Sequence, residues 1–358
     1  MAVLCRSMLL CFPMLVIGVT LGASLATAQL SSTLTLRATE MVDQDDMTFW
    51  LHPTDLALST IIASDKSANR LFVYDLHGTT LQVITAQEPG NIDMRYDFRL
   101  AGATIDIVAF NERRTRKIRV YKVDPTTRQL APIDNDTIDT GSNYGFTLYK
   151  SPVTGDLYAF TGPKPNTQVR QFKLVDAGAG QVAGVEMIRS IPLRPGGTVE
   201  GMAADDETGQ LYLASESEGL WKFGAEPDSN TPGMSIAPVG TNGLTADVEG
   251  VTIYYAANGQ GYLITSSQGN NTFKVYERQA PHTFVGTFMV SGVRKTDGID
   301  VSNLPLPLNG TPSHGLLAVH NGHASPYPVE LVKWERIVQR LHLRPPDTTY
   351  WDPRGDEP

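Results

Sequence analysis

Charged side chains recur along this chain at similar intervals, and their sign changes from its first half to its second. Lys66, Arg113 and Lys164 lie roughly 50 residues apart, a period typical of repeat architectures. Carboxylates follow in the later repeats: Glu200, Glu216, Asp247, Glu249 and Asp297. Clustered cations would hold an anionic ligand, whereas clustered carboxylates repel one another and raise their own pKa values unless cations neutralise them. The two sets together predict a site for metal ions and an anion.

These residues stand at two recurring places in the repeat. One is the loop after an apolar strand, which carries Lys66, Arg113, Lys164, Glu216, Gln268 and Asn321. The other is the start of the preceding strand, at Tyr144-Gly145, Glu200-Gly201, Glu249-Gly250 and Asp297-Gly298, with Asp45, Asp46, Asn91 and Asp93 at similar places in the first two repeats. Glycine lets a backbone pass close to an axis, so we expect the residue before it to face a central channel.

The repeat itself predicts the fold. Apolar strands recur at Ile61–Ala63, Ile105–Ala109, Leu157–Phe160, Leu211–Ala214, Tyr262–Thr265 and Leu316–Val319. Each precedes a strand that contains or ends at an aromatic residue: Tyr74, Tyr121, Phe172, Phe223, Tyr276 or Trp334. A period of roughly 50 residues with about four strands per unit is typical of a propeller blade. We therefore predict an all-β fold, a six-bladed β-propeller. A pair of β-sandwiches is the alternative, but it does not require six copies of one unit.

The two ends of the chain differ from the repeats. Residues 1–28 are typical of a secretory signal, because the apolar run Met8–Leu25 follows Arg6 and precedes the small-residue pattern Ala26-Thr27-Ala28. A membrane anchor is the alternative, but the run is interrupted by Pro13 and several glycines and lacks a basic flank. We predict a secreted or periplasmic protein with one propeller domain over residues 29–344. A short helix should begin near Trp334, and residues 345–358 form a polar, Pro-rich tail.

Composition narrows the chemistry. Both cysteines precede residue 29, so the mature chain has no thiolate ligand or nucleophile. A net charge of −9 argues against nucleic-acid binding, and no segment after the leader reaches membrane-spanning length. Oxygen donors without cysteine favour hard ions, Ca²⁺ above all, and phosphate is an anion that both the metal and the lysine and arginine side chains would bind. A monomer is expected, since a closed ring leaves few free strand edges.

Long strings of the sequence resemble the calcium-dependent β-propeller phytases of bacteria. They include NIDMRYDF (91–98), NYGFTLYKS (143–151), EGMAADDETGQLYLASE (200–216), DVEGVTIYYAANGQGYLITSSQGN (247–270) and TDGIDV (296–301). The resemblance implies a six-bladed propeller that binds several Ca²⁺ ions. It also implies a 3-phytase, a phosphomonoesterase that hydrolyses phytate (myo-inositol hexakisphosphate) to lower inositol phosphates and phosphate.

The resemblance implies a role for each matching residue. The calcium ligands would be Tyr144, Glu200, Glu216, Asp247, Glu249 and Gln268, joined by Asp297 at the equivalent place in the last repeat. The phosphate-binding cations would be Lys66, Arg113 and Lys164, and a structural calcium would lie at Asp46 and the backbone near Ile92. The catalytic set is then Lys66, Arg113, Tyr144, Lys164, Glu200, Glu216 and Gln268. In this scheme a calcium-bound water attacks phosphorus in line while the cations stabilise the equatorial oxygens.

The chain departs from the family pattern near the end of the ring. Val293-Arg294-Lys295 continues directly into Thr296 where the family has an acidic insertion, and His320-Asn321-Gly322-His323 replaces a Gln-Asp-Gly-rich loop. These changes would weaken a stabilising pair of calcium sites, so we expect heat resistance to depend less on calcium than in relatives with the full loop. We interpret His320 and His323 as solvated loop histidines rather than metal ligands.

Two other functions stay open at this point. One is a catalytically inactive propeller that binds inositol phosphates. The other is a different metal-dependent propeller hydrolase, such as a lactonase, which would hold a single calcium ion at the axis and would not need Lys66, Arg113 and Lys164. Fold by itself does not separate these functions from a phytase.

Overall fold

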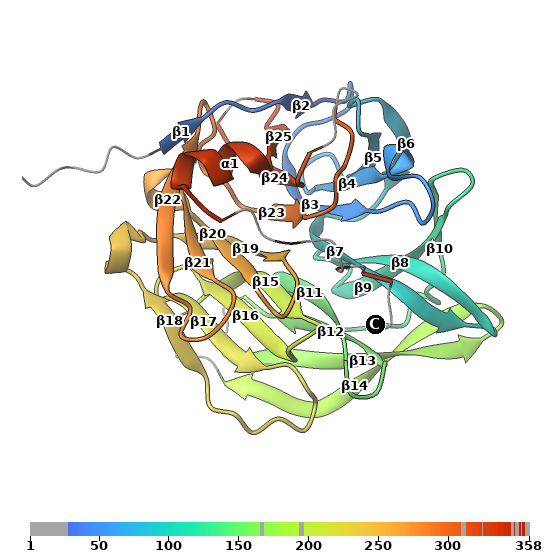
Figure 1. The fold of residues 1–358 in the computed structure, drawn as a ribbon. Helices are drawn as coiled ribbons and strands as arrows, with labels where there is room; N and C mark the ends of the chain where they lie inside the picture. Colours follow the sequence, from blue (N-terminus) through green and yellow to red (C-terminus); the bar gives the residue numbers. More distant parts are fainter. Residues whose placement is uncertain are drawn as a thin grey trace, which may run out of the picture.

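Six antiparallel β-sheets surround a common axis in the computed structural model, as Figure 1 shows. The structure describes residues 28–164, 168–192, 197–308, 313–323, 325–344, 347, 351, 353 and 354. The innermost strand of each sheet contacts the innermost strands of both neighbouring sheets, so the ring is continuous. The predicted six-bladed β-propeller is therefore confirmed, and the alternative of two sandwiches is wrong.

The blades follow the order of the chain, and their strands run from the axis outward. Blade 1 contains β3 (Gln44–Trp50), β4 (Thr60–Asp65), β5 (Arg70–Asp75) and β6 (Thr80–Thr85). Blade 2 contains β7 (Pro89–Leu100), β8 (Ala103–Glu112), β9 (Lys117–Asp124) and β10 (Gln129–Pro132). Blade 3 contains β11 (Gly145–Lys150), β12 (Leu157–Gly162), β13 (Gln168–Gly178) and β14 (Gln181–Pro192).

The second half of the ring repeats this arrangement. Blade 4 contains β15 (Val199–Asp205), β16 (Gln210–Ser215), β17 (Gly219–Gly224) and β18 (Met234–Pro238). Blade 5 contains β19 (Val248–Tyr255), β20 (Gly261–Ser267), β21 (Thr272–Glu277) and β22 (Phe284–Val290). Blade 6 contains β23 (Ile299–Ser302), β24 (Leu316–His320) and β25 (Val329–Lys333). Short 3₁₀ turns lie at η1 (Leu56–Leu58), η2 (Thr241–Gly243) and η3 (Gln268–Asn270).

The N-terminal segment closes the ring. Strand β2 (Leu34–Leu36) pairs antiparallel with β25 and becomes the outer strand of blade 6. Strand β1 (Ala28–Leu30) pairs parallel with β22 and adds a fifth strand to blade 5. Backbone hydrogen bonds thus join the N-terminal segment to the last two blades. The added strands also cover the outer edges of these two sheets.

The hydrophobic core lies between the blades. The second strand of a blade is buried on both faces over most of its length, as in β4 and β12, where all six residues are buried. This explains why these strands appear in the sequence as continuous apolar runs rather than alternating ones. One core cluster joins Trp50 of blade 1, Phe110 of blade 2 and Leu316 of blade 6.

Glycine sets the spacing at the axis, as the sequence predicted. A Cβ atom on Gly201 would lie 2.2 Å from the carbonyl oxygen of Glu249, and one on Gly250 would lie 2.6 Å from that of Asp297. Real Cβ atoms do not approach so closely, so only glycine lets the inner strands meet here. The side chains immediately before these glycines are consequently drawn together at one end of the channel.

The helix predicted near Trp334 is confirmed as α1 (Trp334–Leu341). The Trp334 ring stacks on Tyr254 with a centroid distance of 4.0 Å, and Ile337 is fully buried. Within the described part of the chain no helix is long and apolar enough to cross a membrane. The predicted signal falls almost entirely on residues 1–27, which lie outside the described residues.

Candidate active site

The two recurring places predicted from the sequence meet at one end of the central channel. Strand starts supply one group of side chains, and the loops after β4, β8, β12, β16 and β20 supply the other. We call this set the channel mouth: Asp45, Lys66, Arg113, Tyr144, Lys164, Glu200, Glu216, Asp247, Glu249, Gln268 and Asp297. Every predicted site residue belongs to it except Asp46 and Ile92, which lie farther along the channel.

Two of the three predicted cations are held by carboxylates. The Nζ atom of Lys66 lies 2.7 Å from Asp45 Oδ1 and 3.1 Å from Asp297 Oδ2. The Nη2 atom of Arg113 lies 3.1 Å from Asp45 Oδ2 and also donates to Glu200 Oε1. Burial lowers the pKa of both cations, but these carboxylates outweigh it and raise the pKa of each above its ordinary value. Both side chains are therefore charged and fixed in place.

Lys164 is held more loosely than the other two cations. Its side chain is 51% exposed, and its Nζ atom lies 4.0 Å from Glu216 Oε1. The same atom lies 3.9 Å from the centroid of the Tyr144 ring. Lys164 therefore retains the freedom to contact a ligand at the mouth.

Three glutamates form the acidic centre of the mouth. Carboxylate oxygens of Glu200, Glu216 and Glu249 lie within 4.8 Å of one another, which is close enough for one metal ion to bind all three. Burial raises the pKa of each carboxyl, and the charges of neighbouring carboxylates raise the pKa of Glu249 farther, well above its ordinary range. Glu249 Oε2 has no hydrogen-bond partner among the described residues, although the side chain is buried. A buried carboxylate without a donor fits a bound cation.

Gln268 and Asp297 connect the acidic centre to Lys66. Gln268 begins η3, and its Nε2 atom donates to Asp297 Oδ1 at 2.7 Å. Burial, and then the charge of Asp45, raises the pKa of Asp297 to about 6. Asp247 is exposed beside this group, and its charge raises the pKa of Glu216 and Glu249.

Asp46 and Ile92 meet as predicted, through a hydrogen bond. The Ile92 N–H donates to Asp46 Oδ2 at 3.1 Å, and Asn91 Nδ2 donates to the same oxygen at 3.3 Å. Burial raises the pKa of Asp46 well above its ordinary value despite these donors. The buried Asn91 Oδ1 beside them has no partner among the described residues. The pair brings oxygen donors together, and a calcium site here stays a prediction.

Three residues that were not among the predicted catalytic residues or metal ligands support the site. Asp45 binds both Lys66 and Arg113, and no short motif distinguishes it from Asp46. Asn111 is fully buried and donates from Nδ2 to the Tyr144 carbonyl at 2.8 Å. His320 is 1% exposed and accepts the Asp297 N–H at Nδ1, so its interpretation as a solvated loop histidine is wrong. Burial lowers the pKa of His320 to about 4, and His323 is exposed as expected.

The two departures from the family pattern contact each other. The Arg294 N–H donates to Asn321 Oδ1 at 3.3 Å, and a Cβ atom on Gly322 would lie 2.4 Å from the Lys295 carbonyl oxygen. Protein groups thus fill the junction between these loops. The weaker calcium dependence of heat resistance stays a prediction.

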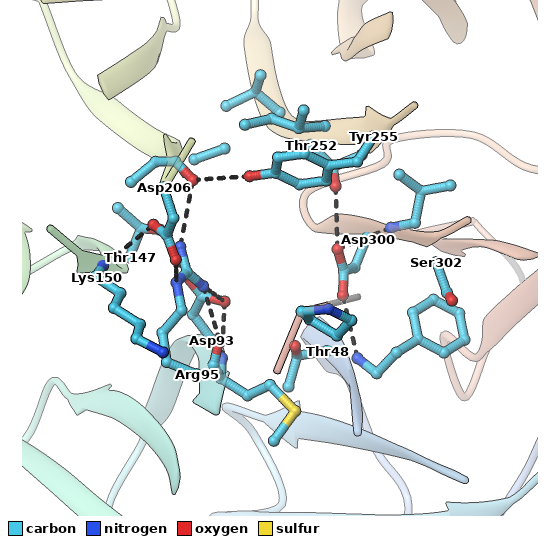
Figure 2. Close-up of a pocket in the computed structure, with 18 of the residues that line it drawn as sticks. Thr48, Asp93, Arg95, Thr147, Lys150, Asp206, Thr252, Tyr255, Asp300 and Ser302 are labelled. Atoms are coloured by element: carbon cyan, nitrogen blue, oxygen red, sulfur yellow. Dashed lines mark hydrogen bonds and ion pairs between the residues drawn. The ribbon is translucent and has the colours of Figure 1, made fainter. Parts of the chain in front are cut away.

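A cavity of about 1200 Å³ lies along the channel behind the mouth. Figure 2 shows side chains from several blades pointing into it, among them Asp93, Arg95, Asp206 and Asp300. The glutamates of the mouth do not line this cavity. The candidate active site is therefore the mouth, where clustered carboxylates, one of them with an oxygen that has no partner among the described residues, lie beside three cations.

Fold and site together define a six-bladed β-propeller with an acidic cluster that could hold a metal ion, next to cations fixed by carboxylates. The phytase family model matches residues 19–355. The 3-phytase of Bacillus subtilis (strain 168) is 38% identical over 319 residues, which cover 84% of this chain and 82% of that protein. This chain belongs to the phytase family, as its sequence resemblance indicated.

Solved structures show a likeness of fold at much lower identity. A calcium-binding protein, regucalcin from Agrobacterium tumefaciens, is 12% identical with a TM-score of 0.52 and covers 86% of this chain and 95% of its own. A luciferin-regenerating enzyme is 14% identical with a TM-score of 0.50 and covers 84% and 95%. At these identities the likeness concerns the fold alone.

Proposed function

We propose that this protein is an exported, calcium-dependent 3-phytase that hydrolyses phytate to lower inositol phosphates and phosphate. One observation carries the proposal: the cluster of Glu200, Glu216 and Glu249 lies beside the cations that interact with its members. Membership of the phytase family supports the same activity. A propeller that held a single axial metal ion would have no use for three cations at this edge.

The donors at the mouth fit calcium. They are carboxylate, phenol and amide oxygens, and calcium accepts six to eight such ligands. The ligands we propose are Tyr144, Glu200, Glu216, Asp247, Glu249, Gln268 and Asp297, with Asp46 and the backbone of Ile92 at a separate structural site. When bound, calcium lowers the pKa of water and neutralises phosphate oxygens, which makes hydrolysis possible near neutral pH.

The chain's own residues orient the substrate. We assign Lys66, Arg113 and Lys164 to the oxygens of the phosphate that is cleaved, since a substrate anion can compete with carboxylates for these cations once calcium neutralises Glu200 and Glu216. Burial and the Glu200 carboxylate raise the pKa of the Tyr144 hydroxyl, so this hydroxyl stays protonated and donates to Glu200 in the calcium-free protein.

The remaining parts of the proposal concern processing and assembly. Residues 1–28 act as a cleaved signal, residues 29–344 form the catalytic domain and residues 345–358 follow as a tail. The mature protein is secreted or periplasmic, acts as a monomer on a small-molecule substrate, and binds neither nucleic acid nor membrane. Sizing of the exported protein and N-terminal sequencing would check the state of assembly and a start at Gln29.

One assay tests the activity. Phosphate release from phytate is measured for the wild type with calcium, then with excess chelator, and for Glu216→Ala with calcium. We expect release only from the wild type with calcium. Binding of inositol phosphates without release under any condition would replace this proposal with an inactive binding propeller, and turnover of a lactone instead of phytate would indicate a lactonase.

A further inference from the structure

Two cations lie close to the ring of Tyr144 at the channel mouth. The Arg113 guanidinium carbon lies 4.4 Å from the centroid of its ring, and the Lys164 Nζ atom lies 3.9 Å from it. Both distances are within the range of a cation–π interaction, about 6 Å. The Tyr144 hydroxyl meanwhile hydrogen-bonds the Glu200 carboxylate. One side chain thus touches both the acidic centre and the cation set.

The backbone of Tyr144 is fixed by two blades. Its N–H donates to the Gly162 carbonyl of blade 3 at 2.6 Å, and its carbonyl accepts from Asn111 Nδ2 of blade 2 at 2.8 Å. Asn111 is fully buried, and a Cβ atom on Gly90 would lie 2.7 Å from its Oδ1 atom and 2.4 Å from Arg113 Nε. The backbone that carries the ring is therefore held rigidly. Close packing against Gly90 also limits the movement of Arg113 beside it.

The ring matters most for Lys164. Arg113 has charged partners at Asp45 and Glu200, whereas Lys164 is half exposed and its one carboxylate contact within the described residues is 4.0 Å long. An exposed lysine without a close partner samples many rotamers, and fixing it costs conformational entropy. A ring face at 3.9 Å restrains the ammonium near the acidic centre before any ligand arrives.

We propose that the ring face of Tyr144 is a positioning element that pre-orients Lys164, together with Arg113, toward the phosphate, in addition to any role of its hydroxyl toward metal. This inference rests on the proposed function of the mouth. It assigns substrate affinity to the ring and metal-linked turnover to the hydroxyl, so that the two contributions of one residue are separable by experiment.

The test compares Tyr144→Phe with Tyr144→Leu in the full mature protein at saturating calcium. Both lose the hydroxyl, and only Tyr144→Leu loses the ring. We expect kcat to fall similarly in both variants. The KM for phytate and the inhibition constant of inorganic phosphate should stay within about twofold of wild type in Tyr144→Phe and rise about tenfold in Tyr144→Leu.

A double-mutant cycle identifies the cation involved. Lys164→Met should raise KM in the wild type and in Tyr144→Phe, but should add little in Tyr144→Leu, where Lys164 is no longer positioned. Equal KM values for Tyr144→Phe and Tyr144→Leu, or an equal cost of Lys164→Met in both, would overturn the inference. A wild type that releases no phosphate from phytate would instead refute the proposed function.

Ring fluorination keeps the test decisive if Tyr144→Leu does not fold. Phenylalanines carrying increasing numbers of fluorine atoms at position 144 keep the shape of the ring and progressively weaken its negative face. We expect log KM to rise with each added fluorine while the melting temperature stays constant. A KM that is insensitive to fluorination would show that the ring only fills space.

Discussion

Both ends of the channel contain carboxylates and cations, but the ends differ in how completely the carboxylates are paired with cations. At the mouth, Glu200, Glu216 and Glu249 outnumber the cations that reach them. The other end, which we call the closed end, contains Asp93, Arg95, Asp205, Asp206, Glu207 and Arg278. Each of its two arginines lies close to two carboxylates. Arg95 lies 2.9 Å from Asp93 and 2.6 Å from Asp206. Figure 2 shows these three side chains next to one another.

A second ion-pair group strengthens the closed end. Arg278 Nη2 lies 2.6 Å from both Asp205 and Glu207, and the guanidinium stacks over the Tyr255 ring at 4.5 Å. On the same ring, Trp351 from the tail stacks at a centroid distance of 5.0 Å. Arg354 of the tail pairs with Asp106 at 2.6 Å. Part of the predicted polar tail thus packs onto this end of the ring.

This difference indicates which end of the channel is the functional one. A buried charge with a complete set of partners stabilises one structure, and removing one partner is costly because the other is left unpaired. A buried carboxylate without partners is a cost that the fold carries for binding something else. Substitutions at the two ends should therefore have opposite signatures, and the predictions below test this.

The largest effect is expected for Arg278→Met at the closed end. The substitution leaves the buried Asp205 carboxylate without its cation, so the free energy of unfolding should fall by about 3–5 kcal/mol. Urea denaturation measures the loss, and activity per folded molecule should stay unchanged. Lys173→Met, which removes a partly exposed pair with Asp156, is the control and should cost no more than about 1 kcal/mol. Similar losses in the two variants would contradict the comparison.

At the mouth, Glu249→Gln should have the opposite signature. Phosphate release should fall about 100-fold, equivalent to about 2.7 kcal/mol, because a carboxylate ligand is lost. The calcium-free protein should become more stable, since an unpartnered buried charge is removed. Activity assays and melting curves with chelator measure the two effects. A lower melting temperature without calcium would show that Glu249 is a structural residue.

The pH dependence of stability should reveal Asp300, which lines the cavity between the two ends. Burial, and then the Asp93 charge, raises its pKa to about 7 from an ordinary 3.8. The folded protein then binds the proton more tightly than the unfolded one. The resulting stability is fully present below pH about 4 and is lost as the pH rises through about 7.

Asp300→Asn isolates this contribution. The unfolding free energy of the wild type minus that of the variant should fall by up to about 1.4 kcal/mol per pH unit between pH 4 and pH 7, and then level off. Urea denaturation with chelator at several pH values measures it. His320 titrates with the opposite sign, because its lowered pKa gives stability that is lost as the pH falls toward 4, but it is present in both proteins. A difference that does not vary with pH would contradict the prediction.

The smallest effect is expected for Trp351→Ala in the tail. Loss of the stack on Tyr255 should lower the free energy of unfolding by about 1 kcal/mol and leave phosphate release unchanged. Thermal melting of the calcium-loaded protein measures it. A change in KM for phytate would show that the closed end communicates with the mouth.

Local sequence determined the fold and most of the site. Apolar runs such as Leu211–Ala214, the glycines after Glu200, Glu249 and Asp297, and the nearly constant period together predict six blades whose equivalent loops meet. These features can be recognised in the sequence because strand burial and close approach of the backbone each depend on only a few consecutive residues. The repeat then brings together residues that lie far apart in sequence.

Only the tertiary structure decided which charges are left without partners. In sequence, Asp205 and Glu249 are both acidic residues near one end of an inner strand, yet Arg278 neutralises one and no described donor reaches Oε2 of the other. Likewise, burial of His320 and the contact of Asp45 with Arg113 depend on other blades. Whether a charged side chain has a partner depends on its distance in space from side chains of other repeats, and a linear pattern does not contain that distance.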